Sequence, residues 1–196
     1  ASFRVIGVVL KYFFIPQFRS KRGVPCCPVV NVEHSLDELI PFKPEYRPTY
    51  MSFTILWISI IGYIYRVRGE KAEPDIFALF RLIEKAYLEA HWVYSRMMTT
   101  TDRPKPRGDI KLAMVHAIDP HLYCIPSLHV VIVSIAWLFV DRISGKSGYP
   151  DLSDLRDLIY RQAVTIAESI LLIKQHSVNC IPAGLYLVCH LMKECT

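Results

Sequence analysis

The sequence predicts an all-α fold: a bundle of about six helices that passes several times through a membrane, as one domain over residues 1–196. Two observations lead to this prediction. The chain is 52% hydrophobic, with a mean hydropathy of +0.26, which is high for a soluble protein. Residues 49–66 carry no charge before Arg66 and have tyrosines near both ends, a pattern typical of a membrane helix with interfacial aromatic residues.

The other helices of the N-terminal half are predicted from their apolar runs. The first, roughly 2–17, is interpreted as a membrane helix rather than a signal peptide, because no small-residue cleavage site follows it. A polar, proline-containing stretch then leads to about residue 48. It holds a basic cluster of Arg19, Lys21 and Arg22. A long helix over 75–98 carries charges along one face, which in a membrane must face the interior or a water-filled cavity.

The C-terminal half begins with a predicted loop over 99–126, marked by prolines. Helices are predicted over 127–143, about 153–176, and 181–192. Several of these segments are shorter than the roughly 20 residues that cross a bilayer. A soluble all-helical protein with a very apolar core is therefore the alternative fold.

Composition narrows the classes of partner. The formal net charge of +5 and the sequence pI of about 8.9 favour acidic partners, such as phosphates or a membrane surface. No signature of DNA or RNA binding occurs in the sequence, so we expect no nucleic-acid partner. The six cysteines lack the paired spacing of a zinc site, which indicates buried free thiols rather than a metal centre.

Three polar motifs occur at predicted helix ends. They are Arg96 with Arg103-Pro104, then Pro126-Ser127-Leu128-His129, then Ser169 with Lys174-Gln175-His176. If successive helices alternate in direction, all three ends lie on one side of the bundle. A helix start such as that at Ser127 also offers backbone N–H groups and the positive end of the helix dipole, which favour an anion.

In order, spacing and helix placement, these motifs resemble those of the type 2 phosphatidic acid phosphatase superfamily. The family patterns are Lys-x6-Arg-Pro, Pro-Ser-Gly-His and Ser-Arg-x5-His-x3-Asp. The leucine in Pro-Ser-Leu-His, the Lys-Gln-His triplet and the segment LDELIPFKP at 36–44 are similar to its inositol phosphorylceramide synthase-like branch. The resemblance covers about residues 30–190. It implies a phosphatidic acid phosphatase/haloperoxidase-like core.

The resemblance also implies an enzyme that works through a phosphohistidine, without metal or cofactor. His176 would be the nucleophile, and His129 the general acid that protonates the leaving oxygen. The implied phosphate ligands are Arg96, Arg103, Ser127, Leu128 and Lys174. The substrate would be a phospholipid, a sphingolipid or a polyprenyl phosphate in the membrane. Water as acceptor would make the protein a phosphatase, and a lipid or sugar alcohol would make it a phosphotransferase.

The sequence departs from the family pattern at four positions. Arg96 stands for the first lysine, Leu128 for the glycine, and Ile170 for an arginine whose charge Lys174 would supply. The most serious departure is Cys180, which stands where the family has the aspartate that orients the nucleophilic histidine.

Two functions stay open besides catalysis at the membrane, and the loss of that aspartate suggests the first of them. One is a degenerate membrane protein that binds lipid phosphate without turnover, and the other is a soluble helical phosphatase with a small substrate. Asn179 and Asp102 are candidate replacements for the aspartate. The deciding feature is whether another carboxylate lies within hydrogen-bond reach of His176.

Overall fold

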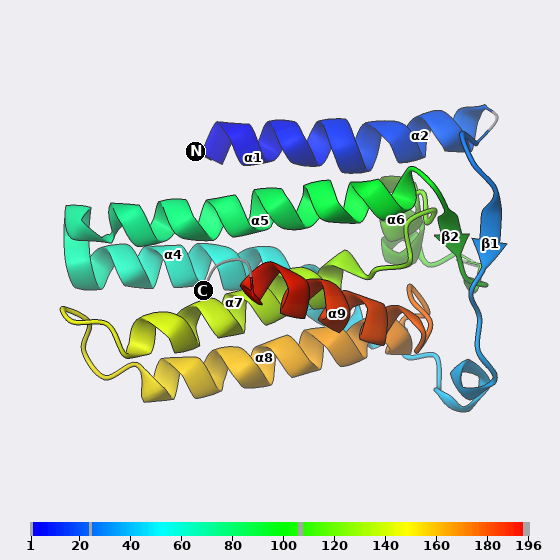
Figure 1. Ribbon diagram of the computed structural model, residues 1–196. Helices are drawn as coiled ribbons and strands as arrows, with labels where there is room; N and C mark the ends of the chain where they lie inside the picture. Colours follow the sequence, from blue (N-terminus) through cyan, green and yellow to red (C-terminus); the bar gives the residue numbers. More distant parts are fainter. Residues whose placement is uncertain (1, 24, 106–107, 194–196) are drawn as a thin grey trace.

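Six helical rods form the body of the described chain (Figure 1). The computed structural model describes residues 2–23, 25–105 and 108–193. The first rod joins α1 (Ser2–Val9), a π-helical turn (Leu10–Phe14) and α2 (Ile15–Arg22), and the others are α4 (Phe53–Arg68), α5 (Glu73–Tyr94), α7 (Leu128–Ser144), α8 (Ser153–Leu172) and α9 (Cys180–Lys193). The prediction of a mostly helical fold with about six helices is therefore confirmed.

α7 is the central helix of the bundle. Its sequence is apolar on nearly every face, and a helix of that kind is stable only when it is covered all round. Val131, Ile135, Ala136 and Val140 are fully buried, and α4, α5, α8 and α9 all pack against this helix. The apolar run predicted as a helix over 127–143 is thus enclosed by protein. A helix of 17 residues is long enough for this packing, although it is shorter than a typical membrane span.

Short elements gather at one end of the bundle, at the right of Figure 1. There β1 (Val29–Asn31) pairs in parallel with β2 (Met98–Thr100). The 3-10 turns Ser35–Leu39 and Pro44–Tyr46 and the short helix α3 (Arg47–Met51) connect β1 to α4. These short elements hold the segments that carry the three sequence motifs.

The predicted loop over 99–126 contains a helix that the sequence analysis missed. α6 covers Ile110–Ile118, and its N-cap Asp109 accepts a hydrogen bond from the Leu112 N–H at 3.0 Å. An aspartate in this position satisfies one of the backbone donors that every helix start leaves open. The nine-residue apolar run was therefore long enough for a helix once Asp109 capped it.

One stretch of the described chain, Pro44–Tyr94, is long and apolar enough to cross a membrane by length and composition. It includes α4 and α5, which a 3-10 turn at Gly69–Ala72 joins. Only 22% of its most apolar window is buried in the protein, and Ile55 and Ile58 on α4 are exposed. The described residues thus show one candidate span, and the several crossings expected from the sequence are not shown.

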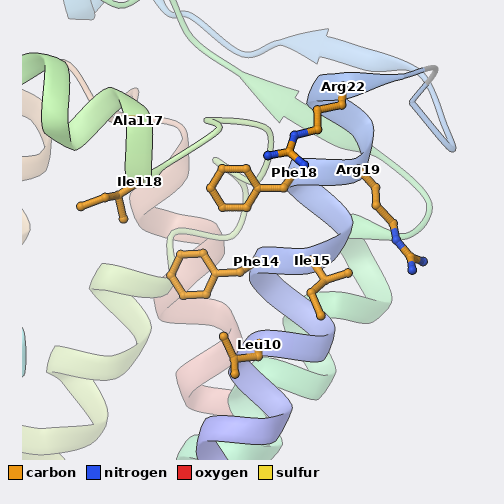
Figure 2. A pocket seen from close by; sticks show the side chains of 8 residues that line it. All are labelled: Leu10, Phe14, Ile15, Phe18, Arg19, Arg22, Ala117 and Ile118. Carbon is orange, nitrogen blue, oxygen red and sulfur yellow. The ribbon is translucent and has the colours of Figure 1, made fainter.

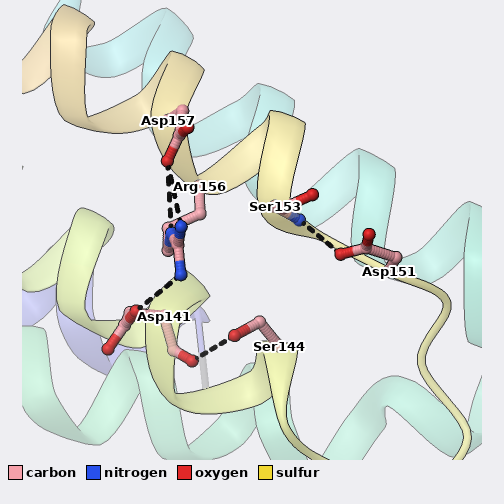
Figure 3. Close-up of polar contacts among 6 residues, drawn as sticks. All are labelled: Asp141, Ser144, Asp151, Ser153, Arg156 and Asp157. Carbon is pink, nitrogen blue, oxygen red and sulfur yellow. Dashed lines mark hydrogen bonds and ion pairs between the residues drawn. The ribbon is translucent and has the colours of Figure 1, made fainter.

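Polar contacts close the end of the bundle that lies away from the sheet. Figure 3 shows Arg156 of α8 between Asp157, at 3.2 Å, and Asp141 of α7, at 3.7 Å. Near the start of α8 the Ser153 N–H donates to Asp151 at 2.9 Å. Exposed ion pairs of this type contribute at most about 1 kcal/mol each, so they add little to the stability of the α7–α8 corner.

A buried carboxylate ties two corners together at the same end. Asp75, at the start of α5, accepts hydrogen bonds from Tyr149 Oη at 2.7 Å and from Arg68 Nη1 at 3.3 Å, and it pairs with Lys146 at 2.5 Å. Tyr149 and Lys146 belong to the α7–α8 connection, whereas Arg68 ends α4. We call these four residues the Asp75 clasp.

Candidate active site

The second and third sequence motifs meet where α7 begins. Ser127 caps α7, because its Oγ accepts a hydrogen bond from the Val130 N–H at 3.5 Å. The Nε2 atom of His176, 49 residues later, lies 3.4 Å from the same Oγ. The rings of His129 and His176 have centroids 5.9 Å apart. Three residues singled out from two motifs therefore form one cluster, as the alternation of helix directions predicted.

The end of α8 determines where His176 points. The sequence predicts a helix to about residue 176, but α8 ends at Leu172. Lys174 adopts a left-handed conformation with φ of 56°, and the Gln175 N–H turns back to the Ile170 carbonyl at 2.9 Å. This is the Schellman ending of a helix, with a lysine where glycine is usual. Because the chain leaves the helix here, His176 faces the start of α7.

His176 has one defined neutral form. Its Nδ1 lies 3.1 Å from the carbonyl oxygen of Cys124, and a carbonyl can only accept, so Nδ1 carries the proton. The Nε2 lone pair is then left on the side of Ser127. Burial lowers the pKa of His176 to about 4, which keeps the ring neutral at pH 7. A neutral imidazole with an unprotonated Nε2 is the form that can attack phosphorus.

A backbone carbonyl, rather than a carboxylate, therefore orients His176 within the described residues. Cys180 is buried at the start of α9, and its carbonyl oxygen lies 3.4 Å from the Ser127 nitrogen that donates to it. The two candidate replacements hydrogen-bond elsewhere, Asn179 to Val32 and Asp102 to Asn31. The carbonyl fixes the tautomer, but it lacks the negative charge that would stabilise a positive imidazole.

His129 is held by aromatic rings from the preceding helices. It stacks on Tyr50 of α3, with centroids 4.2 Å apart, and meets the edge of Phe53 at 4.9 Å. Its Nε2 is buried and has no hydrogen-bond partner among the described residues. A buried polar atom without a partner costs free energy, so a ligand that hydrogen-bonds here would relieve that cost. The sequence around Tyr50 gave no indication that its ring stacks on His129.

Arg103 links the first motif to the third. Its Nη1 donates to the side-chain oxygen of Gln175 at 3.2 Å and to the Asp119 carbonyl at 3.3 Å. Burial lowers the pKa of Arg103, and the nearby Asp119 charge opposes this effect. Gln175 is completely buried, and its Nε2 donor has no partner among the described residues. A guanidinium beside an unsatisfied N–H donor is a suitable environment for a phosphate oxygen.

The other expected phosphate ligands differ in their placement. Arg96 is exposed, with its guanidinium 3.9 Å above the Trp92 ring and a hydrogen bond to the Trp92 carbonyl. Lys174 directs its Nζ to the backbone carbonyl of Asp37. Leu128 is buried in the core at the start of α7, where the first backbone N–H groups of a helix have no acceptor within that helix. The structure thus brings Arg103, Ser127 and Leu128 to the cluster and turns Arg96 and Lys174 to other partners.

Asp37 is a site residue that the sequence analysis missed. One of its oxygens accepts the Val178 N–H at 2.9 Å and the other accepts the His34 N–H at 2.8 Å. Burial acts to raise its pKa, but hydrogen bonds from Ser177 and these two N–H groups dominate and lower it. Asp37 therefore clamps the turn that carries His176. The only signal was its place in the segment 36–44, noted for family similarity alone.

Among the described residues, no group of three or more His, Cys, Asp or Glu side chains is arranged to hold a metal ion. No protein-family model, curated protein or solved structure matches this chain. Its function therefore has to be inferred from the motifs and from the geometry of the cluster.

Proposed function

We propose that this chain is a membrane enzyme that cleaves or transfers phosphate esters of lipids through a phosphohistidine at His176. The observation that carries the proposal is the orientation of His176, whose Nδ1 bonds the Cys124 carbonyl while Nε2 faces the start of α7. A phosphate bound there would meet backbone N–H groups, the helix dipole and the Arg103–Gln175 pair. The three motifs resemble those of the phosphatidic acid phosphatase superfamily in the same order.

The first half of the reaction forms one bond and breaks one. His176 Nε2 attacks phosphorus, an N–P bond forms, and the bond from phosphorus to the lipid oxygen breaks. His129, whose Nε2 has no partner among the described residues, gives its proton to that leaving oxygen. An arriving phosphate brings negative charge, which favours the protonated imidazole that this step needs. Arg103 stabilises the charge that develops on the phosphoryl oxygens.

The second half removes the phosphoryl group from His176. Water, or an alcohol on a lipid or sugar, attacks phosphorus and gives its proton back to His129, and the N–P bond breaks. Phospholipids, sphingolipids and polyprenyl phosphates are the proposed substrate classes. The chain is proposed to reside in the membrane as a multi-pass protein, with Pro44–Tyr94 as its candidate span.

One observation favours a second function, the binding of lipid phosphate without turnover. His176 is oriented by a neutral carbonyl, and a charged orienting group elsewhere contributes up to about 10⁴ in rate. A site with the correct tautomer but without that charge would bind a phosphate and react slowly. The two functions share the same phosphate contacts and differ only in rate.

Phosphate release from a panel of lipid phosphates by the detergent-purified protein tests the proposal. We expect release by the wild type, loss of release in His176→Ala, and retention in His190→Ala, an exposed histidine on α9. Lipid labelled on its phosphate should leave an acid-labile, base-stable label on the wild type and on His190→Ala, and none on His176→Ala. Extraction without detergent would favour the soluble phosphatase instead.

Two results would contradict catalysis. If the wild type releases no phosphate but Cys180→Asp does, the protein binds phosphate but lacks the orienting charge. If neither protein releases phosphate or binds lipid phosphate, both the catalytic function and the binding function are contradicted.

A further inference from the structure

An apolar groove lies between the N-terminal rod and the end of α6, outside the His176 cluster. Figure 2 shows Leu10, Phe14 and Phe18, four residues apart along the rod, with both rings on the side where Ile118 of α6 lies. The groove has a volume of about 730 Å³, within the roughly 300–1,000 Å³ of sites that hold small ligands. Leu10 and Ile118 are each about half exposed, so the groove is open to its surroundings.

One end of the groove is cationic. Arg19 and Arg22 line it, and in the view of Figure 2 the Arg22 guanidinium lies beside the Phe18 ring. Neither arginine forms an ion pair within the described residues. In Figure 2 the Arg19 guanidinium points to the other side of the rod, so the charge beside the apolar wall is that of Arg22. An apolar groove with an unpaired arginine at one end matches a molecule with a hydrocarbon part and a negative head.

The groove also ends one residue from a hydrogen-bond partner of the candidate active site. Ile118 is followed directly by Asp119, whose carbonyl oxygen accepts from Arg103 at 3.3 Å. Arg103 in turn contacts Gln175, next to His176. The charge of Lys21, between Arg19 and Arg22 in the chain, is close enough to act on the pKa of Asp119, although burial has the larger effect and raises it. The cationic end therefore lies toward Asp119, whose carbonyl oxygen accepts from Arg103.

We propose that this groove holds the hydrocarbon chain of the lipid phosphate that reacts at His176, with the phosphate toward Arg103 and the chain along Phe18, Phe14 and Leu10. The inference rests on the proposed function and adds to it the place of the chain. The site thereby selects lipids that carry a phosphate head and an apolar chain together, and Arg22 contributes to the preference for the negative head.

A binding measurement tests the groove without any turnover. The variant Ile118→Trp places a fluorophore in it, and micelles containing lipids brominated along the chain quench a tryptophan that they contact. We expect phosphatidic acid to quench this added emission about fivefold more efficiently than phosphatidylcholine, since one arginine contributes about 1 kcal/mol to an anionic headgroup. Adding Arg22→Gln should remove the preference. Equal quenching by both lipids would overturn the proposal and indicate ordinary contact with surrounding lipid.

A kinetic measurement gives a second test of the groove. We expect Phe14→Ala to lower the ratio of kcat/KM for long-chain phosphatidic acid to that for a water-soluble phosphate monoester about tenfold, because the chain loses an aromatic wall. Phe77→Ala removes an exposed ring from α5 and should leave the ratio unchanged. An unchanged ratio in Phe14→Ala would contradict the groove. If the wild type releases no phosphate from any ester, the catalytic proposal fails, and the quenching measurement still decides the groove.

Discussion

The Nδ1 atom of His176 lies 3.1 Å from the carbonyl oxygen of Cys124, and this one hydrogen bond fixes which nitrogen of the histidine can react. The bond joins residues 52 positions apart, across the space between the turn after α8 and the start of α7. Because a carbonyl only accepts, Nε2 remains unprotonated and faces Ser127. The orienting partner of the candidate nucleophile thus comes from the backbone, where substitution of a side chain cannot remove it.

The buried neutral state of His176 should make stability depend on pH. Its pKa is lowered to about 4 from 6.5, so between these values the unfolded chain binds more protons than the folded one. The free energy of unfolding should therefore fall as the pH is lowered from about 6.5 to 4, by up to about 3 kcal/mol for this group. Unfolding of wild type and His176→Gln at pH 7 and pH 4.5 measures the effect. An equally large loss in the variant would contradict it.

Replacement of Asp37 should loosen the turn that carries His176. Asp37→Ala leaves the partly buried N–H groups of Val178 and His34 without acceptors, and a buried donor without a partner costs at most about 1–3 kcal/mol. We also expect kcat for lipid phosphate to fall roughly 10- to 100-fold at a temperature where the variant is folded, because the nucleophile is misplaced. Glu38→Gln, at an exposed position in the same 3-10 turn, is the control. A loss of stability with unchanged kcat would remove Asp37 from the positioning role.

Close packing of α9 against the start of α7 supports the Ser127 end of the cluster. A Cβ on Gly184 of α9 would lie 3.1 Å from both the Ser127 carbonyl oxygen and the Val130 Cβ. Gly184→Val should therefore push α9 away from the start of α7 and lower the free energy of unfolding by about 1–3 kcal/mol. Gly62→Ala in α4, where nothing lies within 4 Å, should raise it by about 0.5–1 kcal/mol. Denaturant unfolding of both variants checks the contrast, and equal effects would refute the close packing.

The Asp75 clasp should affect stability without affecting chemistry. Asp75→Ala removes the shared acceptor of Lys146, Tyr149 and Arg68, and we expect a loss of about 1–3 kcal/mol in the free energy of unfolding. The clasp lies at the end of the bundle away from His176, so turnover per folded molecule should not change. Thermal unfolding together with phosphate release measures both quantities. A matching fall in turnover would show that the two ends are coupled.

Long apolar runs made most of the fold predictable. The helices expected over 49–66, 127–143 and 181–192 correspond to α4, α7 and α9 within a few residues, since burial of an apolar face dictates the helical period. The strands β1 and β2 have three residues each, too few to show an alternating pattern. α6 was missed because the prolines around it indicated a loop, and its cap at Asp109 was overlooked.

Prediction of the candidate site was limited by local backbone geometry. The helix starting at Ser127 and the proximity of His129 and His176 followed from motif order. The left-handed conformation of Lys174, which ends α8 and reorients His176, had no signal, because a lysine there costs free energy and is uncommon. Arg96 was expected at the site from the family resemblance of its motif, whereas its contacts are with Trp92. The Arg96–Trp92 contact is local, between residues four apart in the chain, and the motif spacing gives no indication of it.

The hydrogen bond from the Val178 N–H to Asp37 spans 141 residues, and this span sets an order on biosynthesis. A ribosome delivers β1 and the Asp37 turn before the His176 turn. α7 and α8 are neighbours in sequence and can associate as soon as both have emerged, since closing a short loop costs little entropy. The growing chain can therefore form α7 and α8 before Asp37 holds His176 in place, because the turn that carries His176 is synthesised after both helices.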